Sequence, residues 1–224
     1  MIIELDLINE ASLFFNISRE EVLEKIKTNP QRAVDDWNNK KSMEDFYRTT
    51  DVYVFGLIEF NCQERLDNLR HPIKMFKGAK ILDYGAGMGI LDIVLAGHNN
   101  VDYYDVDSVT KDFAKYLIKK TDSKVRFIEE EEINKNKYDV IITADVLEHL
   151  VKPMDTLYML HERLNKSGLM FTTGLDFSIG DNTPMHLIEN LEYRKELKDF
   201  FIKNYNLMFY HQTRFETIYL WKKK

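Results

Sequence analysis

Hydrophobic and polar positions follow two different patterns along the chain, and the pattern changes near residue 80. Before that point the apolar residues recur mostly at helical spacing. Ser18 and Glu21 form a capping-box pattern ahead of an apolar periodic run, and Ser42 with Asp45 gives a second helix start. Pro30 is expected to stop or interrupt the first helix, because proline removes a helical hydrogen bond.

The segment 46–60, FYRTTDVYVFGLIEF, is dense in aromatic residues and apolar on nearly every face. We expect it to be buried, as one helix that continues toward Leu69. On this pattern, residues 1–70 form an N-terminal helical cap or lid, and residues 71–224 form the core domain.

After residue 79, short apolar runs alternate with amphipathic runs. The short runs predict strands at 81–84, 101–104, 125–128, 140–143 and 169–173, and the amphipathic runs predict helices at 88–97, 108–120 and 153–165. This alternation predicts an α/β fold whose mostly parallel sheet carries helices on both faces. Two last apolar runs, 207–211 and 215–221, flank a short turn, so the sheet is expected to end in an antiparallel hairpin.

Three glycines, Gly85, Gly87 and Gly89, follow the first predicted strand in the stretch ILDYGAGMGI. Ligands of open parallel sheets bind at the carboxyl ends of the strands, so this loop is a candidate binding loop. A dinucleotide fingerprint would read G-x-G-x-x-G, but the sixth position here is Ile90. The loop therefore predicts a close backbone approach, and Ile90 counts against a nicotinamide-dependent oxidoreductase.

Two further polar features stand at the ends of predicted strands. Asp105 follows Asp83 by 22 residues and ends the second strand, where a carboxylate can accept hydrogen bonds from both hydroxyls of a ribose. The segment 138–150, YDVIITADVLEHL, contains an apolar strand that ends in Ala144 and Asp145. A helix-like run with a glutamate and a histidine follows it.

Together, these three features resemble the class I S-adenosylmethionine-dependent methyltransferases, over about residues 79–173. The resemblance implies a Rossmann-like, seven-stranded sheet with S-adenosylmethionine across the first strand ends. It implies that Asp83 lies near the amino group, that Asp105 holds the ribose and that Val106 packs on the adenine. Glu130 or Glu131 is expected at the adenine edge. The full set of implied cofactor-binding residues is Asp83, Gly85, Ala86, Gly87, Gly89, Asp105, Val106, Glu130, Asp145 and Val146.

Composition and charge narrow the class of protein. The chain is 44% hydrophobic and 30% charged, which is ordinary for a globular protein, and its net charge of −6 disfavours nucleic-acid binding. It has no run of about 18 apolar residues, so no membrane span is expected. The acidic start does not resemble a secretory signal, and one cysteine excludes an internal disulfide. These features favour a cytoplasmic location.

Methyl transfer to a hydroxyl or to an acidic C–H group needs a base, and histidine is the natural choice near neutral pH. His149 follows the fourth predicted strand, and His186 lies in the loop beyond the fifth, so both are candidate catalytic residues. No H-E-x-x-H or two-histidine–carboxylate pattern is present, so no metal is expected.

The expected activity is methyl transfer to a small molecule, because the cap would enclose the site and the protein is acidic. The nucleophilic atom of the acceptor, whether O, N or C, is left open. Other interpretations stay open: cyclisation of S-adenosylmethionine itself, methylation of a protein, or a non-catalytic subunit that only binds the cofactor.

Overall fold

The computed structural model describes residues 5–61, 63–175, 177, 185–214 and 216–224. Within them, seven strands form one sheet in the order β3-β2-β1-β4-β5-β7-β6. The strands are β1 Lys80–Tyr84, β2 Asn100–Tyr104, β3 Val125–Phe127, β4 Tyr138–Thr143, β5 Leu164–Thr172, β6 Tyr205–Gln212 and β7 Thr217–Lys223. Strands β1 to β5 pair in parallel, and β7 is antiparallel to both β5 and β6. The prediction of a mostly parallel sheet that ends in an antiparallel hairpin is confirmed.

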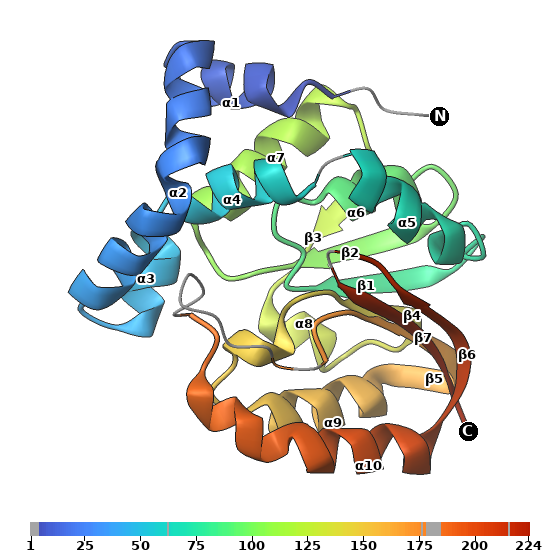
Figure 1. The fold of residues 1–224 in the computed structure, drawn as a ribbon. Helices are drawn as coiled ribbons and strands as arrows, with labels where there is room; N and C mark the ends of the chain where they lie inside the picture. Colours follow the sequence, from blue (N-terminus) through green and yellow to red (C-terminus); the bar gives the residue numbers. More distant parts are fainter. Residues whose placement is uncertain (1–4, 62, 176, 178–184, 215) are drawn as a thin grey trace.

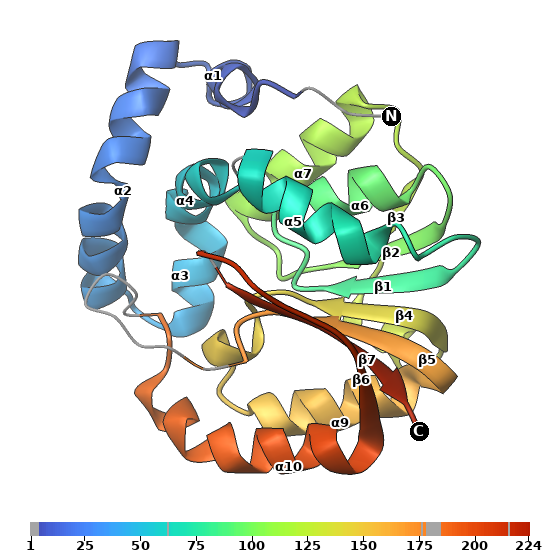
Figure 2. The same ribbon diagram turned by 45° about the vertical axis from the view of Figure 1, so that its right-hand side comes forward.

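Helices cover both faces of this sheet (Figure 1). One side carries α4 Val52–Phe60, α5 Gln63–Ile73, α6 Ile90–Leu95 and α7 Val109–Lys120, with α1 Leu7–Phe15, α2 Arg19–Asn39 and α3 Met43–Thr49 beyond them. The other side carries α9 Pro153–Arg163 and α10 Arg194–Asn204, and the short elements are α8 Glu130–Ile133, η1 Leu147–His149 and η2 Ile188–Tyr193. Figure 2 shows α9 and α10 side by side under the sheet. In the described part of the chain, no helix has the length and apolar character needed to cross a membrane.

The central strands are apolar on both faces, which explains their continuous hydrophobic runs. Ile81 and Val140 are buried in one cluster on the α5 side. Leu82 and Ile141, their neighbours in sequence, are buried in a different cluster with Leu157 of α9. Because a strand buried on both sides needs no polar alternation, these segments could be found from the sequence.

The helix that begins at Ser18 continues through Pro30, so the expected stop there is wrong. Both hydrogen bonds of the predicted capping box are present, and α2 runs on to Asn39. Pro30 lies on the exposed side, whereas Val22 and Ala33 are buried before and after it. A proline in a helix interior costs about 3 kcal/mol through the lost hydrogen bond and the clash of its ring, and the packing of both halves of α2 outweighs that cost.

The segment after Ser42 forms three helices, not one helix that continues toward Leu69. The first break follows Thr49, where Thr50 and Asp51 turn the chain between α3 and α4. The hydroxyl of Thr50 donates to Asp36 and accepts from the Val52 N–H, and Asp51 pairs with Lys25 and Arg32 of α2. Side chains that bond to nearby backbone or to another helix compete with helix continuation. Helix α5 then crosses residue 70, where the cap was expected to end.

Candidate active site

The strand order changes direction between β1 and β4. From β1 the chain moves outward through β2 and β3, and it then returns to β4 and β5 on the other side. Ligands of open α/β sheets bind beside such a switch, at the carboxyl ends of the strands. The loop 85–89 follows β1, Asp105 follows β2, and Asp145 with Val146 follows β4. The structure therefore brings the three predicted segments to one edge of the sheet.

Asp105 holds the glycine loop in place. Its two carboxylate oxygens accept hydrogen bonds from the backbone N–H groups of Gly87 and Val106, each at 2.7 Å. The Tyr103 hydroxyl donates to the Gly87 carbonyl from below, also at 2.7 Å. Burial raises the pKa of Asp105 to about 6, while the two N–H groups and Lys111 oppose that rise. Asp105 thus links the end of β2 to the loop after β1.

Gly85 lets the loop after β1 touch the loop after β4. A Cβ atom on Gly85, whose φ is +76°, would lie 2.5 Å from Cγ2 of Val146. A larger residue would push the two loops apart. Ala86 is half-buried between Gly85 and Gly87, and Gly89 begins α6 with a left-handed backbone. At Gly85, the expected close approach is therefore an approach to protein.

Buried acids lie directly under the glycine loop. Burial, together with the negative charge of Asp105, raises the pKa of Asp83 to about 7. Asp92 of α6 is fully buried, and burial with the charge of Asp83 raises its pKa well above the usual range. Neighbouring buried carboxyl groups resist ionising together, so a cation brought to this place would favour the ionised form.

The residues expected around the adenine lie further out. Val106 is 49% exposed, and Glu130 is the exposed first residue of α8. Glu130 lies close enough to β1 that its charge adds to the effect of burial in raising the pKa of Tyr84. Both residues therefore flank the same edge of the sheet, on the β2 and β3 side.

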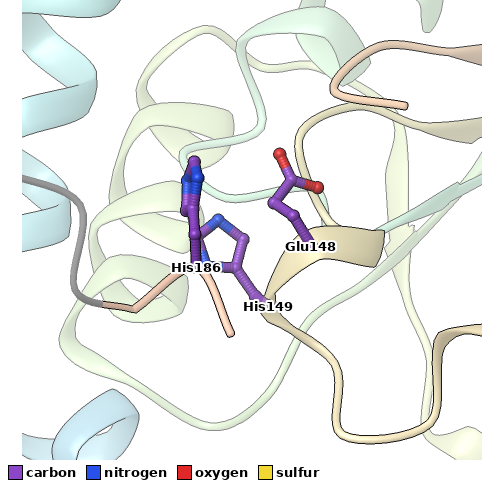
Figure 3. Close-up of side chains that lie close together, drawn as sticks. All are labelled: Glu148, His149 and His186. Atoms are coloured by element: carbon purple, nitrogen blue, oxygen red, sulfur yellow. The ribbon is translucent and has the colours of Figure 1, made fainter. Parts of the chain in front are cut away.

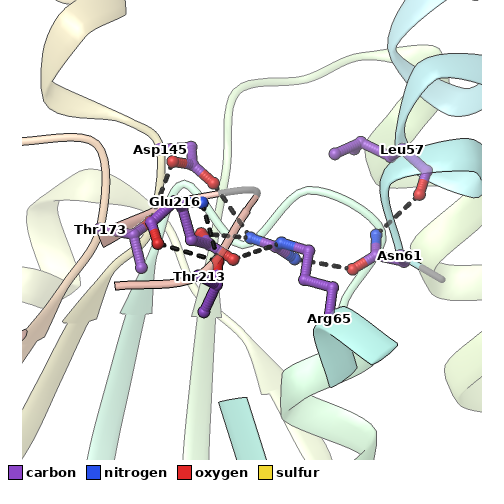
Figure 4. A network of polar contacts seen from close by, with 7 residues as sticks. All are labelled: Leu57, Asn61, Arg65, Asp145, Thr173, Thr213 and Glu216. Carbon is purple, nitrogen blue, oxygen red and sulfur yellow. Dashed lines mark hydrogen bonds and ion pairs between the residues drawn. The ribbon is translucent and has the colours of Figure 1, made fainter. Parts of the chain in front are cut away.

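Asp145 takes part in a buried ion-pair network (Figure 4). Its carboxylate accepts from Arg65 of α5 at 3.0 Å and from the hydroxyl of Thr173 at 2.9 Å. Arg65 also pairs with Glu216, with 2.6 Å between Nε and Oε1, and donates to Asn61. The predicted cofactor residue Asp145 thus has its side chain directed at α5 and at the residue that follows β5, and its contact with the cofactor stays a prediction.

His149 and His186 lie together, and Glu148 lies beside them (Figure 3). The two imidazole ring centroids are 4.7 Å apart. His149 Nδ1 lies 3.2 Å from the Met185 carbonyl oxygen, and a carbonyl only accepts, so Nδ1 carries the proton and Nε2 keeps a lone pair. Burial, and then the charge of His186, lowers the pKa of His149 to about 3. His149 is therefore neutral and weakly basic.

The N-terminal helices cover this histidine pair. Tyr53 of α4 packs edge-on against His149, with 6.2 Å between ring centroids, and Tyr47 of α3 stacks on Tyr53. Met185 is buried in the same cluster as residues of α2, α3 and α4. Burial raises the pKa of Tyr47 to about 12, and the charges of Glu148 and Asp105 add to it. The charges of both acids therefore act on the tyrosine pair.

Three residues that the structure places at this edge were absent from the predicted set. Glu148 had a signal in the sequence, because it adjoins His149 just after a strand. Arg65 and Glu216 had none, since they are 151 residues apart and meet only in the folded chain.

Comparison with known families gives one match across most of the chain. The family model described as "Methyltransferase domain" matches residues 57–219, from α4 into β7. No curated protein matches this chain.

Several solved structures share the fold at low sequence identity. Magnesium protoporphyrin IX methyltransferase (ChlM) from Synechocystis PCC 6803, with bound S-adenosylmethionine, is 14% identical, with all of both chains covered and a TM-score of 0.56. An O-methyltransferase family protein from Burkholderia thailandensis is 11% identical, with 89% of this chain and 71% of that chain covered and a TM-score of 0.58. TehB from Haemophilus influenzae is 18% identical, with 82% and 68% covered and a TM-score of 0.54.

These structural matches establish the shared fold, and the family match establishes membership of the family. Both agree with the glycine loop, with Asp105 and with the segment 138–150, which pointed to the same superfamily. The chain belongs to the methyltransferase-domain family, and its assignment to the class I S-adenosylmethionine-dependent methyltransferases is confirmed.

Proposed function

We propose that this protein transfers a methyl group from S-adenosylmethionine to a small-molecule acceptor. The observation that carries the proposal is the contact of Asp105 with the N–H groups of Gly87 and Val106, at the point where the strand order reverses. This contact places a carboxylate beside a glycine loop at the carboxyl ends of the first two strands.

The side chains at this edge of the sheet fit S-adenosylmethionine. The ammonium of its methionine part is a cation, and Asp83 is a buried acid whose pKa is raised to about 7 and whose ionisation a cation would favour. Asp105 is half-buried, with carboxylate oxygens suited to the two ribose hydroxyls. Val106 offers an exposed apolar side chain on which the adenine would pack. These residues would hold the cofactor, and Gly85, Ala86 and Gly89 would shape the loop around it.

S-adenosylmethionine supplies a methyl group on a positively charged sulfur, which makes the methyl carbon electrophilic. The task of the protein is to hold the acceptor atom in line with that carbon, and orientation of this kind lowers the activation barrier by several kcal/mol. The half-buried tyrosines Tyr47 and Tyr53 and the helices that carry them would exclude water from the acceptor side.

A small acceptor fits the covered position of the histidine pair. His149 lies under Tyr53, and Met185, next to His186, is packed into the cluster of α2, α3 and α4. The N-methyltransferase NodS from Bradyrhizobium japonicum, in complex with S-adenosylhomocysteine, and the magnesium protoporphyrin IX methyltransferase share this fold, which supports the proposal. We assign His186 and His149 to the acceptor side of the site, where they would contact the nucleophile, and the lowered pKa of His149 makes it a poor general base.

Calorimetry with S-adenosylmethionine, S-adenosylhomocysteine and NAD tests the cofactor. We expect the first two to bind and NAD to give no heat. Micromolar binding of NAD, without a response to S-adenosylhomocysteine, would contradict the proposal.

A labelling experiment tests the acceptor. The protein is incubated with methyl-labelled S-adenosylmethionine and a cell extract that has been separated into low-mass and macromolecular fractions. We expect label to enter the low-mass fraction only. Label in the macromolecular fraction would replace the small-molecule acceptor by a protein or a nucleic acid.

A further inference from the structure

Glu148, His149 and His186 form a compact group of metal-ligand side chains. One ligand atom from each residue lies within 4.8 Å of the other two. Glu148 and His149 come from η1 after β4, and His186 comes from the segment before η2, so the group joins two loops (Figure 3). His186 is 37 residues beyond His149, which is why no local two-histidine–carboxylate pattern shows in the sequence.

Hydrogen bonds fix the His149 ring and join the two loops that carry the group. The His149 Nδ1–H donates to the Met185 carbonyl, so the lone pair is on Nε2, the nitrogen on the other side of the ring. Histidine ligands of metals typically donate their second ring nitrogen to a carbonyl or a carboxylate in this way. The Leu187 N–H donates to the carbonyl of Glu148 at 3.1 Å, and the Asn190 amide donates to the same carbonyl at 2.9 Å. The two loops are therefore tied together at the group.

We propose that Glu148, His149 and His186 bind one divalent transition-metal ion. Two imidazoles with one carboxylate suit first-row metals such as Zn²⁺, and three protein ligands leave coordination positions open. Bonds of about 2.1 Å place ligand atoms roughly 3.4 Å apart, so modest side-chain rotations close the present spacing. Gly174 leaves room for the carboxylate, because a Cβ there would lie 2.4 Å from Glu148 Oε1.

The place of this ion also defines the class of acceptor, and this step rests on the proposed methyl transfer. The group lies beneath Tyr53, and Asp105 marks the cofactor side. An acceptor hydroxyl that ligates the ion loses its proton more readily, and the proton passes to solvent. The oxygen then forms the new O–C bond as the C–S bond breaks, with the electron pair staying on sulfur, so neutral S-adenosylhomocysteine leaves. The acceptor is thus an oxygen nucleophile.

Metal titration of the tag-free protein tests the site directly. After treatment with a chelator and dialysis, the protein is titrated with Co²⁺, followed by visible absorption, and with Zn²⁺, followed by calorimetry. We expect one equivalent of each ion to bind. Acetohydroxamate, an oxygen ligand, should then shift the Co²⁺ bands, because positions are open on the ion. Absence of stoichiometric binding would overturn the proposal, and unshifted bands would overturn the role of the ion in acceptor binding.

Three variants locate the site. Glu148→Gln and His186→Asn should each weaken Zn²⁺ binding at least 10-fold. His211→Asn, which removes an exposed histidine from β6, is the matched control and should bind Zn²⁺ like the wild type. Thermal unfolding of all three checks that they are folded. Full Zn²⁺ affinity in both site variants would show that the ion binds elsewhere and would overturn the proposal.

The metal site and the proposed function fail separately. Binding of S-adenosylhomocysteine without binding of Zn²⁺ or Co²⁺ overturns the metal site alone. Binding of metal without binding of S-adenosylhomocysteine overturns methyl transfer alone. If both bind, transfer of the labelled methyl group is measured in the presence of a chelator. We expect the chelator to abolish the transfer and added Zn²⁺ or Co²⁺ to restore it, and transfer that continues in the chelator would overturn the role of the ion.

Discussion

Asp105 is the residue that connects the glycine loop to the second strand, so its removal is the most direct test of the cofactor site. In Asp105→Ala, the charge-assisted hydrogen bonds to the ribose are lost, and binding of S-adenosylhomocysteine should weaken by about 2 kcal/mol, or about 30-fold. The fold should survive, because the residue stands at a strand end. Calorimetry measures the change.

Asp107→Asn provides the matched control for this variant. Asp107 lies two residues further along, with a side chain that is 77% exposed and pairs with Lys111. Its loss should leave cofactor affinity unchanged. Unchanged affinity in folded Asp105→Ala as well would mean that Asp105 is an ordinary strand-end aspartate with no part in cofactor binding.

Asp83 should make cofactor binding depend on pH. Its pKa in the free protein is raised to about 7 by burial and by the charge of Asp105. A bound ammonium group favours the ionised form, so binding releases a proton wherever Asp83 is protonated beforehand. Affinity for S-adenosylhomocysteine should therefore rise with pH from about 5.5 to 7 and level off above that.

Calorimetry across this pH range, in buffers of different ionisation enthalpy, measures both the affinity and the released proton. Asp83→Asn should bind more weakly and should lose the part of the pH dependence near pH 7, whereas Asp105, whose pKa is raised to about 6, keeps its own part. Affinity that is flat or that falls as pH rises would show that the ammonium does not lie beside Asp83.

The sequence predicted individual residues well where one short segment carries the whole feature. Gly85 to Gly89 and Asp105 each follow directly from a strand end, so their grouping could be expected from the parallel sheet. Glu148 and His186 could not be paired in advance, because their proximity depends on how the chain returns after β5. Residues that come together only through tertiary packing show no characteristic spacing in the sequence.

At the scale of elements, Arg65 ties helix α5 to both β4 and β7. Its side chain is 6% exposed, and that of its partner Glu216 is 4% exposed. Arg65→Gln leaves the buried Glu216 and the half-buried Asp145 without their cation, which should lower the free energy of unfolding by about 3 kcal/mol. Urea unfolding followed by circular dichroism measures this loss.

The defect of Arg65→Gln should shrink in acid. Without Arg65, burial and Asp145 raise the pKa of Glu216 further above its unfolded value, so stability is lost as pH rises and regained as pH falls. The control is Arg214→Gln, which breaks an ion pair with Glu64 between nearly the same elements. That pair is 68% and 54% exposed, so its loss should cost less than about 1 kcal/mol. Equal losses in both variants would contradict a special role for Arg65.

Element boundaries show which sequence patterns are decisive. The capping box at Ser18 correctly marked the start of α2, because both of its hydrogen bonds are local. The prediction of a helix stop at Pro30 was wrong, because the packing of a 21-residue helix outweighs the few kcal/mol that a proline costs. The break at Thr50 depends on contacts with Asp36, Lys25 and Arg32 of α2. Because no local pattern shows these contacts, the continuous aromatic run was predicted as one helix.

At the scale of the whole molecule, the N-terminal helices are built into the site and are not an appendage. Phe15 of α1 stacks on Phe55 of α4 at 5.2 Å between centroids, and Phe14 packs against Phe113 of α7 at 5.1 Å. This layer joins the cap to the core on the cofactor side. Helix α3 packs instead on the cluster around Met185, beside the histidine pair. The division into a cap of residues 1–70 and a core of residues 71–224 stays a proposal, and α5 spans its boundary.

This arrangement predicts that the cofactor site and the cap respond together. Lids are drawn from the less stable parts of a fold, and α3 is short, with Phe46 as its buried residue. S-adenosylhomocysteine should therefore slow hydrogen exchange between about Ser42 and Phe60, as well as in the loop 85–89. Helix α10, on the opposite face, serves as the internal control and should exchange at the same rate with and without ligand. Protection confined to the glycine loop and Asp105 would mean that residues 1–70 are packing or a partner surface. The small-molecule acceptor would then lose its main support, and a macromolecular acceptor at an open site would be the better interpretation.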